Sequence, residues 1–178
     1  FFFLGNTDPK KNSERTILAF AKYLELSSVK RELLIADLSN DIIDDILKRN
    51  NIEYAREYIV SAGYVDNKDL VSIYNAAFAF LYTSLRESFG IPLLESMACG
   101  TPVITSNTSS MPEVAGVDSA LIDPTDVNSI TDMMLRLEND GEYYSRIREY
   151  GLQRVNMFSW NHTAELLLSL YAEVYNEI

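Results

Sequence analysis

The sequence predicts an α/β protein with a doubly wound parallel sheet and a C-terminal helical tail. Short apolar runs alternate with segments of helical periodicity, which predicts repeated strand–helix–strand units. The runs are almost continuously apolar, as in strands that are buried on both faces. After residue 125 the pattern is wholly helical. With right-handed crossovers, these observations predict a Rossmann-like domain followed by helices.

Six apolar runs are the predicted strands, and they cover residues 1–5, 32–36, 58–62, 77–82, 102–105 and 119–122. The first run, FFFLG, already reads as a strand at the first residue. We therefore expect the chain to be a piece of a longer protein, with the missing part on the N-terminal side.

The helices predicted between these strands cover residues 13–27, 40–50, 67–76 and 92–99. One face of the first helix carries Ile17, Phe20, Ala21 and Leu24. In the helical tail, a first apolar stripe comprises Val127, Ile130, Met134 and Leu137. A second stripe, behind a Ser159 cap, comprises Trp160, Ala164, Leu167, Tyr171 and Val174. We expect Trp160 to anchor the last helix by burial. The helical spacing of Tyr171 and Tyr175 predicts packing, for some of the tyrosines against the missing domain.

Composition limits the function classes. The 178 residues suit one domain, and 26 acidic against 15 basic residues give a net charge of -11. Such a surface argues against nucleic-acid binding and against adhesion to anionic lipid. The single cysteine excludes an internal disulfide and is typical of a cytoplasmic protein. We expect a cytoplasmic location, with any membrane attachment made through the missing part of the protein.

The stretch ESFGIPLLESMACGTPVI, residues 87–104, is the main candidate site. Its proline at position 92 predicts a helix start, because proline is preferred at the first helical positions. The backbone N–H groups of Phe89, Gly90 and Ile91 would then point outward at the positive end of the helix. In a parallel α/β sheet this end lies at the carboxyl edge, where ligands bind. The sequence therefore predicts an anion site there.

Glu87 and Glu95 flank this predicted site, eight positions apart. They are either solvated acids near a helix N-terminus, which is a common arrangement, or contacts for a ligand. A ligand with hydroxyl groups beside its phosphates, such as a nucleotide sugar, would satisfy both the carboxylates and the amides.

The first loop, GNTDPKKNSER, supplies cations, namely Lys10, Lys11 and Arg15. It lacks the glycine spacing and the Gly-Lys-Ser/Thr ending of a Walker loop. The loop is either a solvated basic turn or a second phosphate contact on the same edge of the sheet, and the anion site predicted nearby favours the second interpretation.

With both loops considered, the chain resembles the C-terminal domain of a GT-B-fold retaining glycosyltransferase of the large group often called family 4. The Glu-x7-Glu block of that family stands here as SLRESFGIPLLESMACGTPVITS, residues 84–106. Further family-like segments follow the family order at residues 4–12, 63–77, 109–114 and 158–160. The resemblance covers essentially the whole chain, residues 1–178, which is thus expected to be the donor-binding domain without its N-terminal acceptor domain.

The resemblance implies roles for individual residues. Lys11 matches the lysine that contacts the donor diphosphate, Glu95 the glutamate that accepts from the ribose hydroxyls, and Glu87 the one near the donor hexose. The amides of Phe89, Gly90 and Ile91 match those that contact sugar and phosphate, and Leu94 is placed with the donor-binding residues.

Two positions depart from the family pattern. Ser88 stands where a glycine is usual before Phe89. Asn6 stands where many members have an arginine after the first-loop glycine, and Lys10 would be its substitute.

The implied reaction moves a hexose from a GDP- or UDP-linked donor to a glycan or lipid-linked acceptor with retention. It uses no cofactor and no metal: Lys11 and the helix N-terminus would stabilise the leaving diphosphate, and Glu87 would position the donor. The fragment alone is expected to transfer little. Two alternatives stay open: a GT-B relative such as a nucleotide-sugar epimerase, and a non-catalytic α/β interaction module. No catalysis is assigned to His162 or Cys99.

Overall fold

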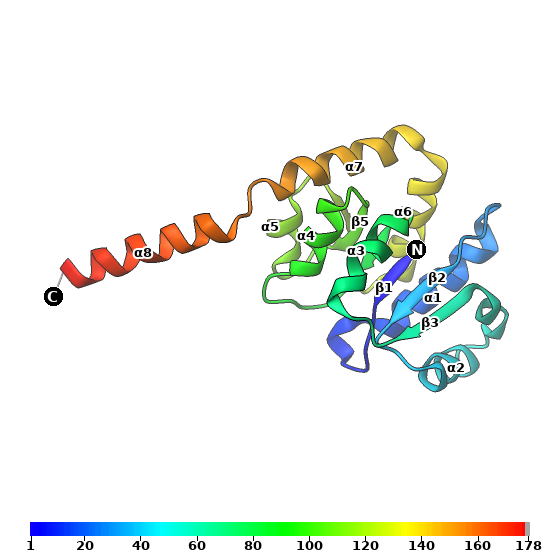
Figure 1. Cartoon of the computed structure of the whole chain (residues 1–178). Helices are drawn as coiled ribbons and strands as arrows, with labels where there is room; N and C mark the ends of the chain where they lie inside the picture. Colours follow the sequence, from blue (N-terminus) through cyan, green and yellow to red (C-terminus); the bar gives the residue numbers. More distant parts are fainter. Residues whose placement is uncertain (177–178) are drawn as a thin grey trace.

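The structure is a computed structural model that describes residues 1–176 of the chain. Six strands form one parallel sheet in the order β3-β2-β1-β4-β5-β6. Figure 1 labels the neighbouring strands β1, β2 and β3. The six strands are β1 (Phe2–Leu4), β2 (Leu33–Ala36), β3 (Ile59–Gly63), β4 (Phe80–Tyr82), β5 (Val103–Ser106) and β6 (Ala120–Ile122). The predicted α/β fold class and all six predicted strands are confirmed.

Eight α-helices occur in the described residues. They are α1 (Ser13–Leu26), α2 (Asn40–Arg49), α3 (Asn67–Ala76), α4 (Ile91–Ala98), α5 (Met111–Ala115), α6 (Val127–Asn139), α7 (Gly141–Val155) and α8 (Trp160–Asn176). The four helices predicted between strands are confirmed, although α4 begins one residue before Pro92. The sequence does not predict α5 or the 3-10 turns η1 (Pro9–Lys11) and η2 (Glu53–Tyr58), because elements this short have no measurable periodicity.

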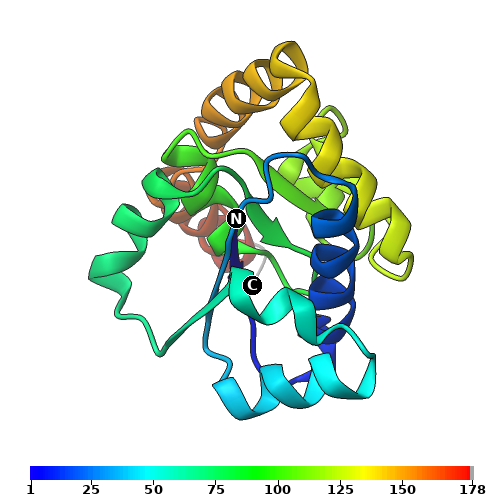
Figure 2. The same cartoon turned by 90° about the vertical axis from the view of Figure 1, so that its right-hand side faces the viewer.

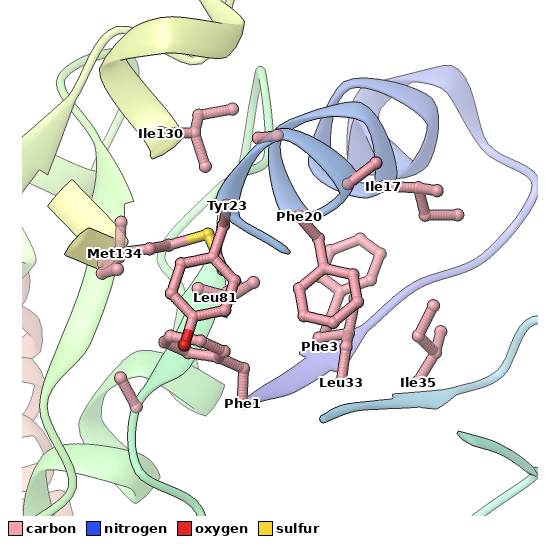
Figure 3. Close-up of a cluster of buried hydrophobic side chains, with 14 of the residues drawn as sticks. Phe1, Phe3, Ile17, Phe20, Tyr23, Leu33, Ile35, Leu81, Ile130 and Met134 are labelled. Atoms are coloured by element: carbon pink, nitrogen blue, oxygen red, sulfur yellow. The ribbon is translucent and has the colours of Figure 1, made fainter. Parts of the chain in front are cut away.

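The helices cover the sheet in two layers. Side chains of α1, α2 and α6 form one buried cluster with the sheet, and those of α3, α4 and α5 form the other. Figure 2 shows α1 (dark blue) and α6 (yellow) side by side, and the two helices are in contact. The predicted stripe of α1 is buried, and Figure 3 shows Phe20 of this helix close to Phe3 and Leu33 of the sheet.

Strand β1 demonstrates why its sequence is continuously apolar. Successive side chains point to opposite faces of a strand. Phe1 and Phe3 accordingly lie in the first cluster and Phe2 in the second, and all three are buried. The edge strand β3 is different, since Val60 is half exposed on it. Burial on both faces is therefore a property of the inner strands.

Helix α8 corrects the prediction for the tail. The helix projects from the rest of the chain (Figure 1), and Trp160 is 79% exposed. Tyr171 and Tyr175 are exposed as well. The prediction that Trp160 anchors this helix by burial is therefore wrong. The two tyrosines do not pack within the described residues, and their packing against the missing domain stays a prediction. An apolar stripe identifies a helix face that favours burial, but not the surface that would bury it.

The backbone amide of His162 approaches the Ser159 hydroxyl at 3.5 Å, as expected for the predicted cap. None of the helices in residues 1–176 is long and apolar enough to cross a membrane.

Candidate functional site

The sheet order places a topological switch point between β1 and β4. Strand β2, which follows β1 in the chain, pairs on one side of β1, and β4 pairs on the other side. The loops that follow β1 and β4 therefore diverge at the carboxyl edge of the sheet. Such a crevice is the usual ligand position in an open α/β sheet. The loop after β1 carries Lys10 and Lys11, and the loop after β4 carries Glu87, Phe89 and Gly90.

Asn12 joins these two loops. Its backbone has the left-handed φ of 61°, which ends η1 directly after Lys11. Its buried Nδ2 donates to the carbonyl oxygens of Thr83 at 3.1 Å and Pro124 at 2.7 Å. The Leu85 amide donates to the Lys10 carbonyl at 2.7 Å. The first loop is thereby fixed to the end of β4.

Lys11 and Glu87 form an ion pair at this edge, with 2.7 Å between Nζ and Oε1. Their side chains are only 18% and 15% exposed. Burial alone would raise the pKa of Glu87, but hydrogen bonds from Lys11 and Ser84 and the charge of Lys11 outweigh it and hold that pKa below its ordinary value. The two residues that the sequence analysis placed on separate loops are therefore in direct contact.

This ion pair predicts an acid-side loss of stability. Because the pKa of Glu87 is lower in the folded protein than its ordinary value of 4.5, its contribution is complete above that pH and is lost as the pH falls through the folded pKa. We expect Glu87→Gln to reduce the drop in unfolding free energy between about pH 7 and about pH 3.5 by about 1 kcal/mol or less. Urea unfolding at both pH values measures it. The control is Glu173→Gln on the exposed helix α8. If Glu87→Gln leaves the pH-dependent fall in unfolding free energy as in the wild type, or if Glu173→Gln reduces it equally, the ion pair with Lys11 is not its cause.

The N-terminus of α4 follows the loop after β4 and lies at the same edge of the sheet. Gly90 is its N-cap with φ 108°, a conformation that side-chain-bearing residues avoid. A Cβ at this position would lie 3.4 Å from Cε1 of Tyr82, so the backbone passes close over that ring. Among the described hydrogen bonds, none has the N–H of Phe89, Gly90 or Ile91 as donor. These groups lie where the sequence analysis expected an anion-binding terminus.

Two serines that the sequence analysis did not assign hold this turn from behind. The Ser110 hydroxyl is 3.0 Å from the carbonyl oxygens of both Glu87 and Phe89, and the Ser109 hydroxyl donates to the Glu87 carbonyl at 2.8 Å. These bonds use the carbonyl groups of the turn and none of the N–H groups of Phe89, Gly90 and Ile91. The segment SSMPEV, residues 109–114, is family-like, but the sequence does not predict these two serine contacts. Hydrogen bonds between loops leave no periodic pattern in a sequence.

Glu95 lies on α4, is exposed, and has Oε2 3.3 Å from the hydroxyl of Tyr74. Near both glutamates lies Tyr82 at the end of β4. Burial raises the pKa of Tyr82, and the charge of Glu87, a hydrogen bond with it and the charge of Glu95 raise it further. The candidate site thus contains two carboxylates and a lysine near the α4 N-terminus, and the buried tyrosines Tyr74 and Tyr82 lie beside the carboxylates.

The remaining predicted residues lie at the rim. Lys10 is half exposed and pairs with Asp8 at 3.3 Å. Phe89 and Ile91 are exposed, whereas Leu94 is partly buried against the core. A hollow of about 460 Å³ opens on the outer face of α4, lined by these three residues, Glu95 and the chain around Trp160. Lys11 and Glu87 do not line it.

Fold and site together define a Rossmann-like α/β protein with its candidate ligand site at the switch point of the sheet. Residues 1–154 match the family described as Glycosyl transferases group 1, and the chain belongs to this family. The O-antigen chain mannosyltransferase B of Escherichia coli is 34% identical over 170 residues, which are 95% of this chain and 44% of that relative. The chain thus spans less than half the length of this relative.

Solved structures share the fold. The C-terminal domain of the glycosyl transferase group 1 family protein LpcC from Francisella tularensis superposes with a TM-score of 0.76 at 21% identity, covering 88% of this chain and 83% of that one. HepE from Anabaena, solved in complex with UDP and glucose, has a TM-score of 0.80 at 18% identity, covering 94% of this chain and 47% of that one. The resemblance to the C-terminal domain of GT-B glycosyltransferases is confirmed.

Proposed function

We propose that this chain is the donor-binding domain of a hexosyltransferase and holds a nucleoside-diphosphate sugar between the loops after β1 and β4. The contact that carries the proposal is the ion pair of Lys11 with Glu87 beside the N-terminus of α4. The ion pair places a cation and a carboxylate at the carboxyl edge of the sheet, where the backbone N–H groups before α4 also lie. A ligand with both phosphates and hydroxyl groups can use all three.

In this proposal the diphosphate binds Lys11 and the amides of Phe89, Gly90 and Ile91. Glu95 accepts from the ribose hydroxyls and Glu87 from a hexose hydroxyl, while Lys11 stays close enough to contact both the phosphate and Glu87. As the anomeric bond breaks, negative charge grows on the leaving diphosphate, and the lysine and the helix terminus stabilise it. Retention at the anomeric carbon and transfer without metal or cofactor are parts of the proposal that come from the family resemblance.

The whole protein is proposed to have a second domain that binds a glycan or lipid-linked acceptor. The chain covers 44% of the O-antigen mannosyltransferase, which leaves room for such a domain in a protein of similar length. Mannose is the favoured sugar, because that relative is named a mannosyltransferase. The domain alone is expected to bind nucleotide but to transfer no sugar.

Calorimetric titration with GDP, UDP and ADP in the presence of EDTA tests the proposal. We expect one of the three nucleotides to bind the chain. Glu95→Ala should weaken that binding about tenfold, the low end for a hydrogen bond to a charged group, since Glu95 is exposed. The free nucleoside should lose affinity in the variant as well. Glu142→Ala, at an exposed helix N-terminus outside the site, is the control and should leave binding unchanged.

Two outcomes would contradict the proposal. Failure of all three nucleotides to bind, both to the chain and to the longer protein, would favour an interaction module. Conversion of the donor sugar by the longer protein without acceptor would favour an epimerase.

A further inference from the structure

Tyr74 lies under the candidate site but belongs to none of its loops. It lies in the last turn of α3 and is 1% exposed. Its ring makes edge-to-face contacts with Phe2 and Phe80, with centroids 5.5 and 5.2 Å apart. Its hydroxyl is 3.3 Å from Oε2 of Glu95, 21 residues further along the chain.

Core packing alone does not account for a tyrosine here. The contacts with Phe2 and Phe80 involve only the ring, so phenylalanine would make them equally well. A buried hydroxyl group needs a hydrogen-bond partner, and in the described residues the Tyr74 hydroxyl has Glu95. Burial raises the pKa of Tyr74, and the charge of Glu95 and their hydrogen bond raise it further, so the phenol stays protonated and remains a donor.

The position of this donor is fixed from both ends. The aromatic contacts hold the ring, and the Tyr74 carbonyl accepts from the Thr101 hydroxyl at 2.6 Å. Glu95, in contrast, is exposed and has several rotamers open to it. A hydrogen bond from a fixed donor to Oε2 selects one orientation of the carboxylate. No described hydrogen bond uses its other oxygen, Oε1, and Oε2 keeps a second lone pair, so the carboxylate can still accept from two ligand hydroxyl groups.

We infer that Tyr74 is a positioning residue, which holds the Glu95 carboxylate in the orientation that accepts from two adjacent hydroxyl groups of the ligand. The inference rests on the proposed function, in which this diol belongs to the ribose of the donor nucleotide. Tyr74 does not touch the ligand. It removes the cost of ordering the glutamate during binding, which is of the size measured for immobilising one long side chain.

The test compares a ribonucleotide with its 2′,3′-dideoxy analogue, using GDP and 2′,3′-dideoxy-GDP or the corresponding pair for whichever base binds. Tyr74→Phe removes only the hydroxyl and keeps the ring contacts. We expect this variant to bind the ribonucleotide about three- to tenfold more weakly and to bind the dideoxy analogue as tightly as the wild type does. In a Glu95→Ala background, Tyr74→Phe should have no further effect on either ligand.

Tyr144→Phe is the matched control. Its ring is partly buried, and its hydroxyl donates to the Phe78 carbonyl at 3.0 Å. Phe78 comes before the start of β4, so this bond lies at the opposite edge of the sheet from the candidate site. It should lose some stability and no affinity. If Tyr74→Phe weakens binding of both ligands equally, or of neither, the inference about Tyr74 is overturned and the proposed function is not affected. If the wild type binds no nucleotide, the proposed function fails, and the inference fails with it.

Discussion

Replacing Lys11 with alanine is expected to weaken binding of the nucleoside diphosphate by about 1.5–3 kcal/mol, which is about one to two orders of magnitude in Kd. The lysine is the cation closest to Glu87 at the crevice, and its side chain is only 18% exposed, so solvent screens it little. The variant also leaves Glu87 without its partner, and the unpaired carboxylate would repel the phosphates. Calorimetric titration of the binding nucleotide measures the loss.

Three controls separate these contributions. Lys10→Ala removes a half-exposed cation of the same loop, which pairs with Asp8, and is expected to have a clearly smaller effect. Lys11→Ala combined with Glu87→Gln should regain the part of the loss that comes from the unpaired carboxylate. The nucleoside without phosphates should bind the wild type and Lys11→Ala equally. Equal losses in Lys10→Ala and Lys11→Ala would show that only the net charge of the loop matters.

The convergence of Lys11 and Glu87 could be predicted from the sequence, although they are 76 positions apart. Each follows an apolar strand, and strands of a parallel sheet end at the same edge. The continuous apolar runs and the fold class they predict are enough to place both loops at the same edge of the sheet. The 2.7 Å contact itself was beyond that reasoning, because it depends on the conformation of two irregular loops.

Tyr74 and Asn12 show what sequence patterns leave out. Tyr74 has the helical spacing of an ordinary core residue, and only the position of α3 against α4 reveals that its hydroxyl reaches Glu95. Asn12 follows Lys11 in a polar loop and has no pattern that predicts burial. Trp160 is the opposite case, because its apolar stripe predicted burial and the described residues leave it exposed. The periodicity of apolar residues predicts which face of a helix or strand favours burial. It does not predict which residues that face contacts, because this depends on how the elements pack.

Asn12→Ala is expected to lower the free energy of unfolding by about 3–4 kcal/mol. The asparagine is 4% exposed, and its amide donates to the carbonyl oxygens of Thr83 and Pro124. Without it two buried acceptors lose their partner, and each is expected to cost about 1–1.5 kcal/mol, the low end of the range for an unsatisfied group, because a carbonyl oxygen can turn to another donor more easily than an N–H can. Alanine also tolerates the φ of 61° poorly, which adds about 1 kcal/mol. Urea unfolding at neutral pH measures the sum.

Asn12→Gly divides this loss into its parts. Glycine adopts a positive φ without strain, so the glycine variant should be about 1 kcal/mol more stable than the alanine variant and still less stable than wild type. Asn75→Ala is the control, since its amide makes one exposed hydrogen bond within α3, to the Val71 carbonyl at 2.7 Å, and should cost about 0.5 kcal/mol or less. Similar losses in Asn12→Ala and Asn75→Ala would mean that the two interloop bonds contribute little.

The same asparagine connects stability with the site. Its two bonds run to the end of β4 and to the segment after β6, and Lys11 is its neighbour in the chain. If these bonds hold the lysine in place, Asn12→Gly should weaken nucleotide binding even at temperatures where the variant is fully folded. The loss should be absent when Lys11 is already alanine, because a loop with no cation gains nothing from its position. If the losses of nucleotide affinity from Asn12→Gly and Lys11→Ala are additive, Asn12 does not act by positioning Lys11 and contributes only to stability.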